Sequence, residues 1–299
     1  MVPATSRARF ARYAVGASKS RADHEFQDGE IVISTTIKLS SPATRQFWEI
    51  PVLYEDAELL ALDKPSGLPV SPARDDPNRP NLMQLLHSGI AEGKPWAKVR
   101  ALSYLMNAHR LDFEGTGMLL LAKSKRVLVK LANLFGSEIP TKRYIALAQG
   151  SPKEERFEVG AKLASHPARA GFVRVDSRHG KRARTRFQVL ERFAGWTLLH
   201  CDLLTDRPHQ VRVHLQNVGL PLAADSLYGG QPLLLSALKP GYHLKPHKTE
   251  WPLISRPAMH AERLGLPHPQ TGEMVTITAP WPKDLNVCVK YLRRYAVGV

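Results

Sequence analysis

The segment Asn107–Lys123, NAHRLDFEGTGMLLLAK, places an arginine and an aspartate two residues apart, ahead of a glycine-bearing turn and an apolar run. A guanidinium near Asp112 would favour the ionised carboxylate, the form that attacks as a nucleophile. At the edge of a sheet such a carboxylate could face a cleft. A structural pair of Arg110 and Asp112 that closes a turn is the commoner arrangement, so the motif alone leaves both interpretations open.

A second segment with chemistry-bearing side chains is Thr205–Leu215, TDRPHQVRVHL. On a helix, His209, Arg212 and Gln216 would share one face. The buried face would hold Val211, Leu215 and Val218. A cationic face at a helix start suits a phosphate or a carboxylate, because free backbone N–H groups and the helix dipole add to the charge. A solvated amphipathic face is the alternative.

A basic run, Arg169–Arg186, carries seven Lys or Arg residues and one acid. Such a run can follow a phosphate backbone, and aromatic rings within it could stack on bases. Phe172 within the run and Phe187 directly after it are explained at least as well by the core. The charge therefore supports a polyanionic partner, and the aromatics add nothing to that inference.

The overall charge agrees with this reading. Lys and Arg number 42 against 27 Asp and Glu, which gives a formal net charge of +15 and a pI near 10.0. A polyanionic partner follows, either nucleic acid or an anionic membrane surface. With 299 residues and 43% hydrophobic content the chain can bury a sizeable core. The first 22 residues hold three Arg before position 13 and no acid, which is typical of a basic arm or an organelle transit peptide.

Several classes are disfavoured. The longest apolar runs fall short of the roughly 20 residues that a membrane-spanning helix requires. The two cysteines, Cys201 and Cys288, form no CxxC pair, so neither a disulfide framework nor a structural zinc site is expected, and a reducing, cytoplasmic location fits. His243 and His247 have the spacing of helical metal ligands, but Pro246 lies between them, so no metal site is expected.

Strands dominate the predicted elements. Apolar patterning predicts strands at Ile31–Leu39 and Lys142–Gly150, a hairpin within Pro51–Val70 and a strand pair within Arg184–Leu204 that turns at Ala194 and Gly195. Helices are predicted at Ser124–Phe135, with Ser124 as N-cap, and in the segment between Asp206 and Gly219, with Pro208 in its first turn. We find no repeat and no glycine-rich fingerprint, so a mixed α+β sheet protein is favoured over a doubly wound nucleotide-binding fold.

Five blocks of the sequence recur in one known family in the same order. They are LYEDAELLALDKPSGLPV, HRLDFEGTGMLLLAK, KRYIALAQG, LLTDRPHQVRVHLQNVGLPLAADSLYGG and HAERLGLPHPQTGEMVTITAPWP. Together they resemble the RluA-type family of RNA pseudouridine synthases over most of the chain, from about Pro51 to Leu285.

The resemblance implies an extended, mostly antiparallel sheet with flanking helices and a central basic cleft, and a reaction without cofactor or metal. It implies that Asp112 is the catalytic carboxylate, that Arg212 pairs with it, and that Tyr144 lies against the uracil ring and is a candidate base. Without the resemblance, Tyr144 would be read as a packed strand tyrosine. The expected RNA contacts are Lys64, Arg110, Arg207, His209 and Gln210.

The chemistry so implied breaks the N1–C1′ bond of uridine, turns the base and joins C5 to C1′, with the nucleotide extruded from its stack. Two departures from the family pattern stand in the fourth block, Asp206 for a glycine and Pro208 for a hydroxyl residue. A negative charge there could narrow substrate choice. The turn GTG, Gly115–Gly117, replaces TSG and keeps a tight turn.

We therefore expect residues 1–50 to be a basic and polar extension without a recognisable S4 domain, and residues 51–299 to be the catalytic domain of a cytoplasmic monomer that acts on tRNA or rRNA. A non-catalytic RNA-binding or ribosome-assembly protein on the same scaffold is the alternative. A glycosidase-like enzyme ranks third, because the matching blocks offer as second acid only Asp202, Asp206 and Asp225.

Overall fold

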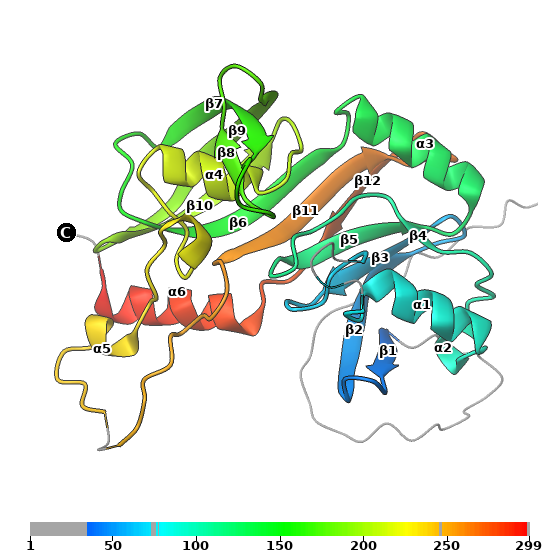
Figure 1. Cartoon of the computed structure of the whole chain (residues 1–299), viewed down its shortest axis with the longest axis horizontal. Helices are drawn as coiled ribbons and strands as arrows, with labels where there is room; N and C mark the ends of the chain where they lie inside the picture. The colour runs from blue at the N-terminus through cyan, green and yellow to red at the C-terminus, as the bar shows by residue number, and fades with distance from the viewer. Residues whose placement is uncertain (1–34, 73–75, 77, 245–246, 298–299) are drawn as a thin grey trace, which may run out of the picture. The chain divides into compact units, whose positions relative to one another are not determined.

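A single mixed sheet organises the computed structural model, which describes residues 35–72, 76, 78–244 and 247–297. Within these residues the sheet has 12 strands in the order β1-β2-β3-β5-β11-β6-β10-β9-β7-β8, with β12 beside β11 and β4 beside β5 (Figure 1). Neighbouring strands are antiparallel except β11 and β5, which pair in parallel. The predicted fold class, a mostly antiparallel α+β sheet with flanking helices, is confirmed.

The strands are β1 (Thr36–Ser41), β2 (Gln46–Glu55), β3 (Leu59–Lys64), β4 (Met106–Asn107), β5 (Thr116–Ala122), β6 (Thr141–Gln149), β7 (Arg156–Ser165), β8 (Val173–Val175), β9 (Lys181–Phe193), β10 (Trp196–Leu203), β11 (Met259–Pro267) and β12 (Met274–Thr278). The helices are α1 (Leu82–Ala91), α2 (Pro95–Lys98), α3 (Lys125–Gly136), α4 (Gln210–Asn217), the 3-10 turn η1 (Ser226–Tyr228), α5 (Leu235–Leu238) and α6 (Lys283–Tyr295). No helix in these parts of the chain is long and apolar enough to cross a membrane.

The N-terminal part of the sheet begins before the predicted catalytic domain. The strand expected at 31–39 is found at Thr36–Ser41, and residues 31–34 lie outside the described residues. This strand pairs with β2, which starts at Gln46 and so runs through the predicted boundary at residue 50. The predicted hairpin of β2 and β3 is confirmed, and the Asp56 carboxylate closes its turn by accepting the N–H groups of Glu58 and Leu59.

Side chains of β6 alternate between two buried layers, as the two-residue period of a strand requires. Tyr144 and Ala146 face the core that also contains α1 and α4, whereas Ile145 and Leu147 face the core that contains α6. The centre of the sheet is therefore covered on both faces. Fixed by packing on both sides, it can hold side chains at its edge in defined positions.

Helix α3 confirms the predicted helix, with the Ser124 hydroxyl accepting the Val127 N–H at 3.3 Å. Strands β6, β9 and β10 likewise confirm the strands predicted after it.

The predicted start of the next helix was wrong. Helix α4 begins at Gln210 after His209, whose φ of 54° is left-handed, and Asp206 pairs with Lys142 instead of capping the helix. The amphipathic pattern was wrong too, since every residue from Gln210 to Leu215 is buried, and Val218 is exposed. The polar side chains of α4 point inward because they have charged or hydrogen-bonding partners there.

Candidate active site

Asp112 lies in the turn between β4 and β5, and the Gly115 N–H donates to its carbonyl oxygen at 3.1 Å. The turn is anchored at Gly117, where β5 meets β11. A Cβ atom on Gly117 would stand 2.3 Å from the Ala261 carbonyl oxygen, and its φ of 109° disfavours any side chain. The glycine thus allows the close backbone approach that fixes the turn carrying Asp112.

Arg212 reaches Asp112 from α4, with 3.5 Å between Nη1 and Oδ2. Its stronger partner is Asp225, which accepts hydrogen bonds from Nε and Nη2, each at 2.7 Å. The Arg212 and Asp225 side chains are 3% and 1% exposed, so this bidentate pair is buried. Glu114 adds a further carboxylate 3.5 Å from Nη2. One guanidinium therefore serves three carboxylates and binds Asp225 most closely.

The Asp112 carboxylate is left with an oxygen that makes no hydrogen bond. Its Oδ2 atom is buried and has no hydrogen-bond partner among the described residues. The Asp112 side chain as a whole is 22% exposed. The carboxylate therefore lies beside a cation while part of its side chain is exposed, and a reacting atom can approach that exposed part, as a nucleophile requires.

His209 and Tyr228 extend this network on its other side. The Tyr228 hydroxyl lies 2.7 Å from His209 Nδ1 and accepts the Val173 N–H at 3.0 Å. His209 Nε2 is 3.9 Å from Asp112 Oδ2, and burial lowers the pKa of His209. The imidazole is therefore neutral at pH 7, and a tyrosine that donates to Nδ1 leaves the proton on Nε2, toward Asp112.

Lys64, at the end of β3, is fully buried. Its Nζ donates to the Pro65 and Phe113 carbonyl oxygens at 2.8 and 3.3 Å. Burial lowers its pKa to about 7, although the negative charge of Asp112 acts in the opposite direction. Lys64 thus ties the loop after β3 to the residue that follows Asp112.

Tyr144 stands on β6, in line with Ala261 of β11 and Cys201 of β10. Burial raises the pKa of its hydroxyl well above the usual value, and the charges of Asp206 and Asp112 raise it further. The phenol is therefore fully protonated at neutral pH, which favours a packing or hydrogen-bonding role over that of a base.

The five residues predicted to contact RNA fall into two groups. Arg110 is exposed, and Arg207 and His209 are partly exposed. Lys64 and Gln210 are buried, and Gln210 binds Thr205 at 2.8 Å and Thr185 at 2.9 Å. Burial and internal partners favour a structural role for these two side chains over direct RNA contact.

The basic run forms a row of charge on β9. Arg182, Arg184 and Arg186 are exposed at alternate positions, and Glu158 of the neighbouring strand pairs with the last two. Phe187 is fully buried and stacks on Phe157, with 4.9 Å between ring centroids. Its aromatic ring belongs to the core, as the alternative reading of this run held.

Sequence reasoning missed the partners of Arg212. Asp225 entered only as a possible second acid, and Tyr228 and Glu114 were given no role. The fourth block contained the signal, since ADSLYGG places an acid and a tyrosine three residues apart. In the part of the chain that the structure describes, no three His, Cys, Asp or Glu side chains gather as metal ligands would.

Comparison with known proteins gives the family of the chain. The family described as RNA pseudouridylate synthase matches residues 58–217. The uncharacterised RNA pseudouridine synthase YlyB of Bacillus subtilis is 30% identical over 285 residues, 94% of this chain and 85% of that protein. Ribosomal large subunit pseudouridine synthase C of Escherichia coli K12 is 35% identical over 244 residues, 81% of this chain and 70% of that protein.

A solved structure with a similar fold is also found. The structure of human RNA pseudouridylate synthase domain containing 4 superposes with a TM-score of 0.61 at 23% identity, covering 81% of this chain and 92% of that one. Fold and sequence define an RNA-modifying isomerase that converts uridine to pseudouridine. Within that class, the chain belongs to the RluA-type family of RNA pseudouridine synthases.

Proposed function

We propose that the protein isomerises uridine in ribosomal RNA with Asp112 as the nucleophile. The observation that carries this role is the partly exposed carboxylate of Asp112, whose Oδ2 atom lies 3.5 Å from the Arg212 guanidinium. The RNA class is supported by relatives named as ribosomal large subunit pseudouridine synthases C and D.

In the proposed reaction Asp112 attacks the sugar at C1′ or assists at the neighbouring position while the N1–C1′ bond breaks. The free base turns and C5 bonds to C1′, while the bond between Asp112 and C1′ breaks or a proton taken from the neighbouring position returns. The proton on C5 leaves to solvent, and N1 gains one. The reaction is redox-neutral and needs no co-reactant, which supports a mechanism without cofactor or metal. Arg212 keeps Asp112 ionised, and the protonated Tyr144 packs against the ring of the base.

RNA would reach the site over a basic surface. Net charge of +15, exposed Arg110 and the arginine row on β9 supply the cations for phosphate contacts. We also propose that the protein is a cytoplasmic monomer; the location is supported by relatives named as ribosomal large subunit pseudouridine synthases.

The test is tritium release from rRNA and tRNA transcripts labelled at uridine C5, with wild-type protein and an Asp112→Asn variant. Asparagine keeps the shape of the side chain and removes the nucleophile, so release is expected to stop while RNA affinity stays within a few-fold. Arg110→Gln is the matched control for binding. Loss of affinity in Asp112→Asn at undiminished turnover of bound RNA would overturn the assignment, and release by Asp112→Asn at the wild-type rate would do the same.

A further inference from the structure

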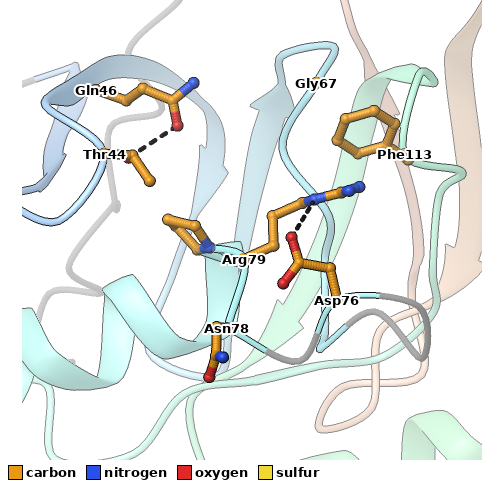
Figure 2. Close-up of a pocket in the computed structure, with 8 residues that line it drawn as sticks. Thr44, Gln46, Gly67, Asp76, Asn78, Arg79 and Phe113 are labelled. Carbon is orange, nitrogen blue, oxygen red and sulfur yellow. Dashed lines mark hydrogen bonds and ion pairs between the residues drawn. The ribbon is translucent and has the colours of Figure 1, made fainter.

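A cavity of about 380 Å³, lined in part by Phe113, has no part in the proposed reaction (Figure 2). Phe113 and Gly67 line one side of the cavity. The other side is lined by Thr44, in the turn between β1 and β2, and by Gln46, the first residue of β2. Arg79 stands between them. A space of this size matches the lower range of small-molecule sites and accommodates one nucleotide base.

Phe113 connects this cavity to the proposed reaction, because it is the residue that follows Asp112 in the chain. Its side chain is 43% exposed although its backbone is tightly held. The Phe113 carbonyl oxygen accepts the Gly67 N–H at 3.0 Å and the Lys64 ammonium at 3.3 Å. A fixed backbone with an exposed ring, one residue from the nucleophile, is not explained by packing in the core.

The rest of the cavity suits a flat, polar-edged group better than an anion. The Arg79 guanidinium lies 5.0 Å from the centroid of the Phe113 ring, but its Nε is also 3.4 Å from the Asp76 carboxylate. That carboxylate offsets the charge an anion would need. At the rim the Thr44 hydroxyl donates to Gln46 Oε1 at 3.0 Å, and both residues are exposed, so a ligand can reach the Gln46 amide.

We propose that this cavity receives the base of a nucleotide next to the target uridine, stacked on Phe113 and read at its edge by Gln46. The inference rests on the proposed function. Extruding a uridine unstacks its neighbours, and an aromatic face with an arginine beside it is the usual platform for an unstacked base. Phe113 follows Asp112 directly in the chain, so a base stacked on it would belong to a nucleotide near the target uridine.

The hydrogen-bonding edge of the cavity lies outside the segment that matches the family, because Thr44 and Gln46 precede residue 58. The hairpin that carries them is firmly attached, since Ile37 and Ile50 pair across it and are both fully buried. Glutamine can bind an adenine edge through two hydrogen bonds, so this position can discriminate between bases. Sequence preference beside the target would then depend on a part of the chain outside the family match.

The first test compares Phe113→Ala with Phe47→Ala. Phe47 is 59% exposed on the same hairpin, and as the neighbour of Gln46 in a strand it points to the opposite side. Steady-state tritium release on labelled rRNA should show kcat/KM reduced about 5- to 150-fold for Phe113→Ala, as expected for one lost base stack, and unchanged for Phe47→Ala. At saturating RNA, kcat should stay within threefold of wild type.

The second test uses short RNA stem-loops around the mapped uridine, with an abasic nucleotide on its 5′ or its 3′ side. On one of the two sides, removal of the base should lower kcat/KM of the wild type by the same factor by which the Phe113→Ala change lowers it on intact RNA. The same abasic RNA should not lower kcat/KM of the Phe113→Ala variant any further. Losses that multiply on both sides would overturn the proposal, and so would a Phe113→Ala variant with wild-type kcat/KM. Failure of the proposed function itself looks different, because wild type would then release no tritium from any RNA.

Discussion

Replacing Asp225 by asparagine tests separately the two roles of Arg212, its buried ion pair with Asp225 and its contact with Asp112. In the wild type Arg212 gives two hydrogen bonds to Asp225 and stands 3.5 Å from Asp112. Asparagine keeps one acceptor, removes the negative charge and turns an NH₂ group toward another donor. Breaking a buried ion pair by removing one partner costs about 3–5 kcal/mol, and the remaining hydrogen bond places the expected loss in unfolding free energy near the lower end.

The effect on turnover should be separate and large. Without Asp225 to hold it, the guanidinium is free to bind Asp112 directly and to occupy the oxygen that is unpaired in the wild type. A displacement of about 1 Å in a catalytic group can cost about 100-fold, so we expect kcat for tritium release to fall by about that factor. RNA affinity should change little, because both side chains are buried.

Urea unfolding and tritium release on the same preparations measure the two effects. As a control, Arg212→Met/Asp225→Leu replaces the buried pair by apolar side chains of similar size. This double variant should recover part of the lost stability, since Asp112 and Glu114 still lose their cation, and it should not recover activity. An Asp225→Asn enzyme with wild-type kcat would refute the positioning role, and a double variant with restored kcat would show that the single change acted only through stability.

Two further predictions concern the fold. Gly117→Ala should lower the unfolding free energy by several kcal/mol in urea titrations, because the new Cβ atom would meet the backbone at 2.3 Å. Gly136→Ala is the control and should be neutral or stabilising, because open space surrounds that position. Equal effects of the two changes would contradict the close-approach argument. Burial lowers the pKa of His214 and His260 to about 4 and that of His109 to about 3, and raises that of Asp63 to about 6. Histidines with lowered pKa contribute fully to stability above pH 6.5 and lose that contribution as pH falls, because the unfolded chain then binds protons that the folded chain does not. Asp63 acts in the opposite direction below pH 6 and offsets one of these three protons, so the unfolding free energy should fall between pH 6 and 4 by up to about 2.7 kcal/mol per pH unit. An unfolding free energy independent of pH over that range would contradict this prediction.

Local sequence signals predicted the strands and one helix because those elements depend on periodicity within a few residues. Ser124 before an apolar face sufficed for α3, and alternation sufficed for β6. The start of α4 failed for a physical reason. Pro208 suggested a first helical turn, but His209 takes a left-handed conformation that brings its ring to Tyr228, so tertiary contacts override the local preference.

The site could be predicted only in part, because its charges are balanced over long sequence distances. Resemblance identified Asp112 and Arg212, and the structure places them 3.5 Å apart. It gave no reason to expect that Asp225 would bind Arg212 more closely than Asp112 does. Nor does any pattern within the LDKPSG segment show that Lys64 would be buried with a pKa near 7, since that follows from packing against Phe113.

The order of the sheet explains how separate motifs come to surround one nucleotide. Gly117 of β5, Ala261 of β11 and Tyr144 of β6 stand in register across three strands. Adjacent strands are about 4.8 Å apart, so the Gly117 and Tyr144 backbones are spaced by about 10 Å across the sheet, with Ala261 between them. A larger residue at position 261 would crowd Tyr144, because both side chains belong to the same buried cluster.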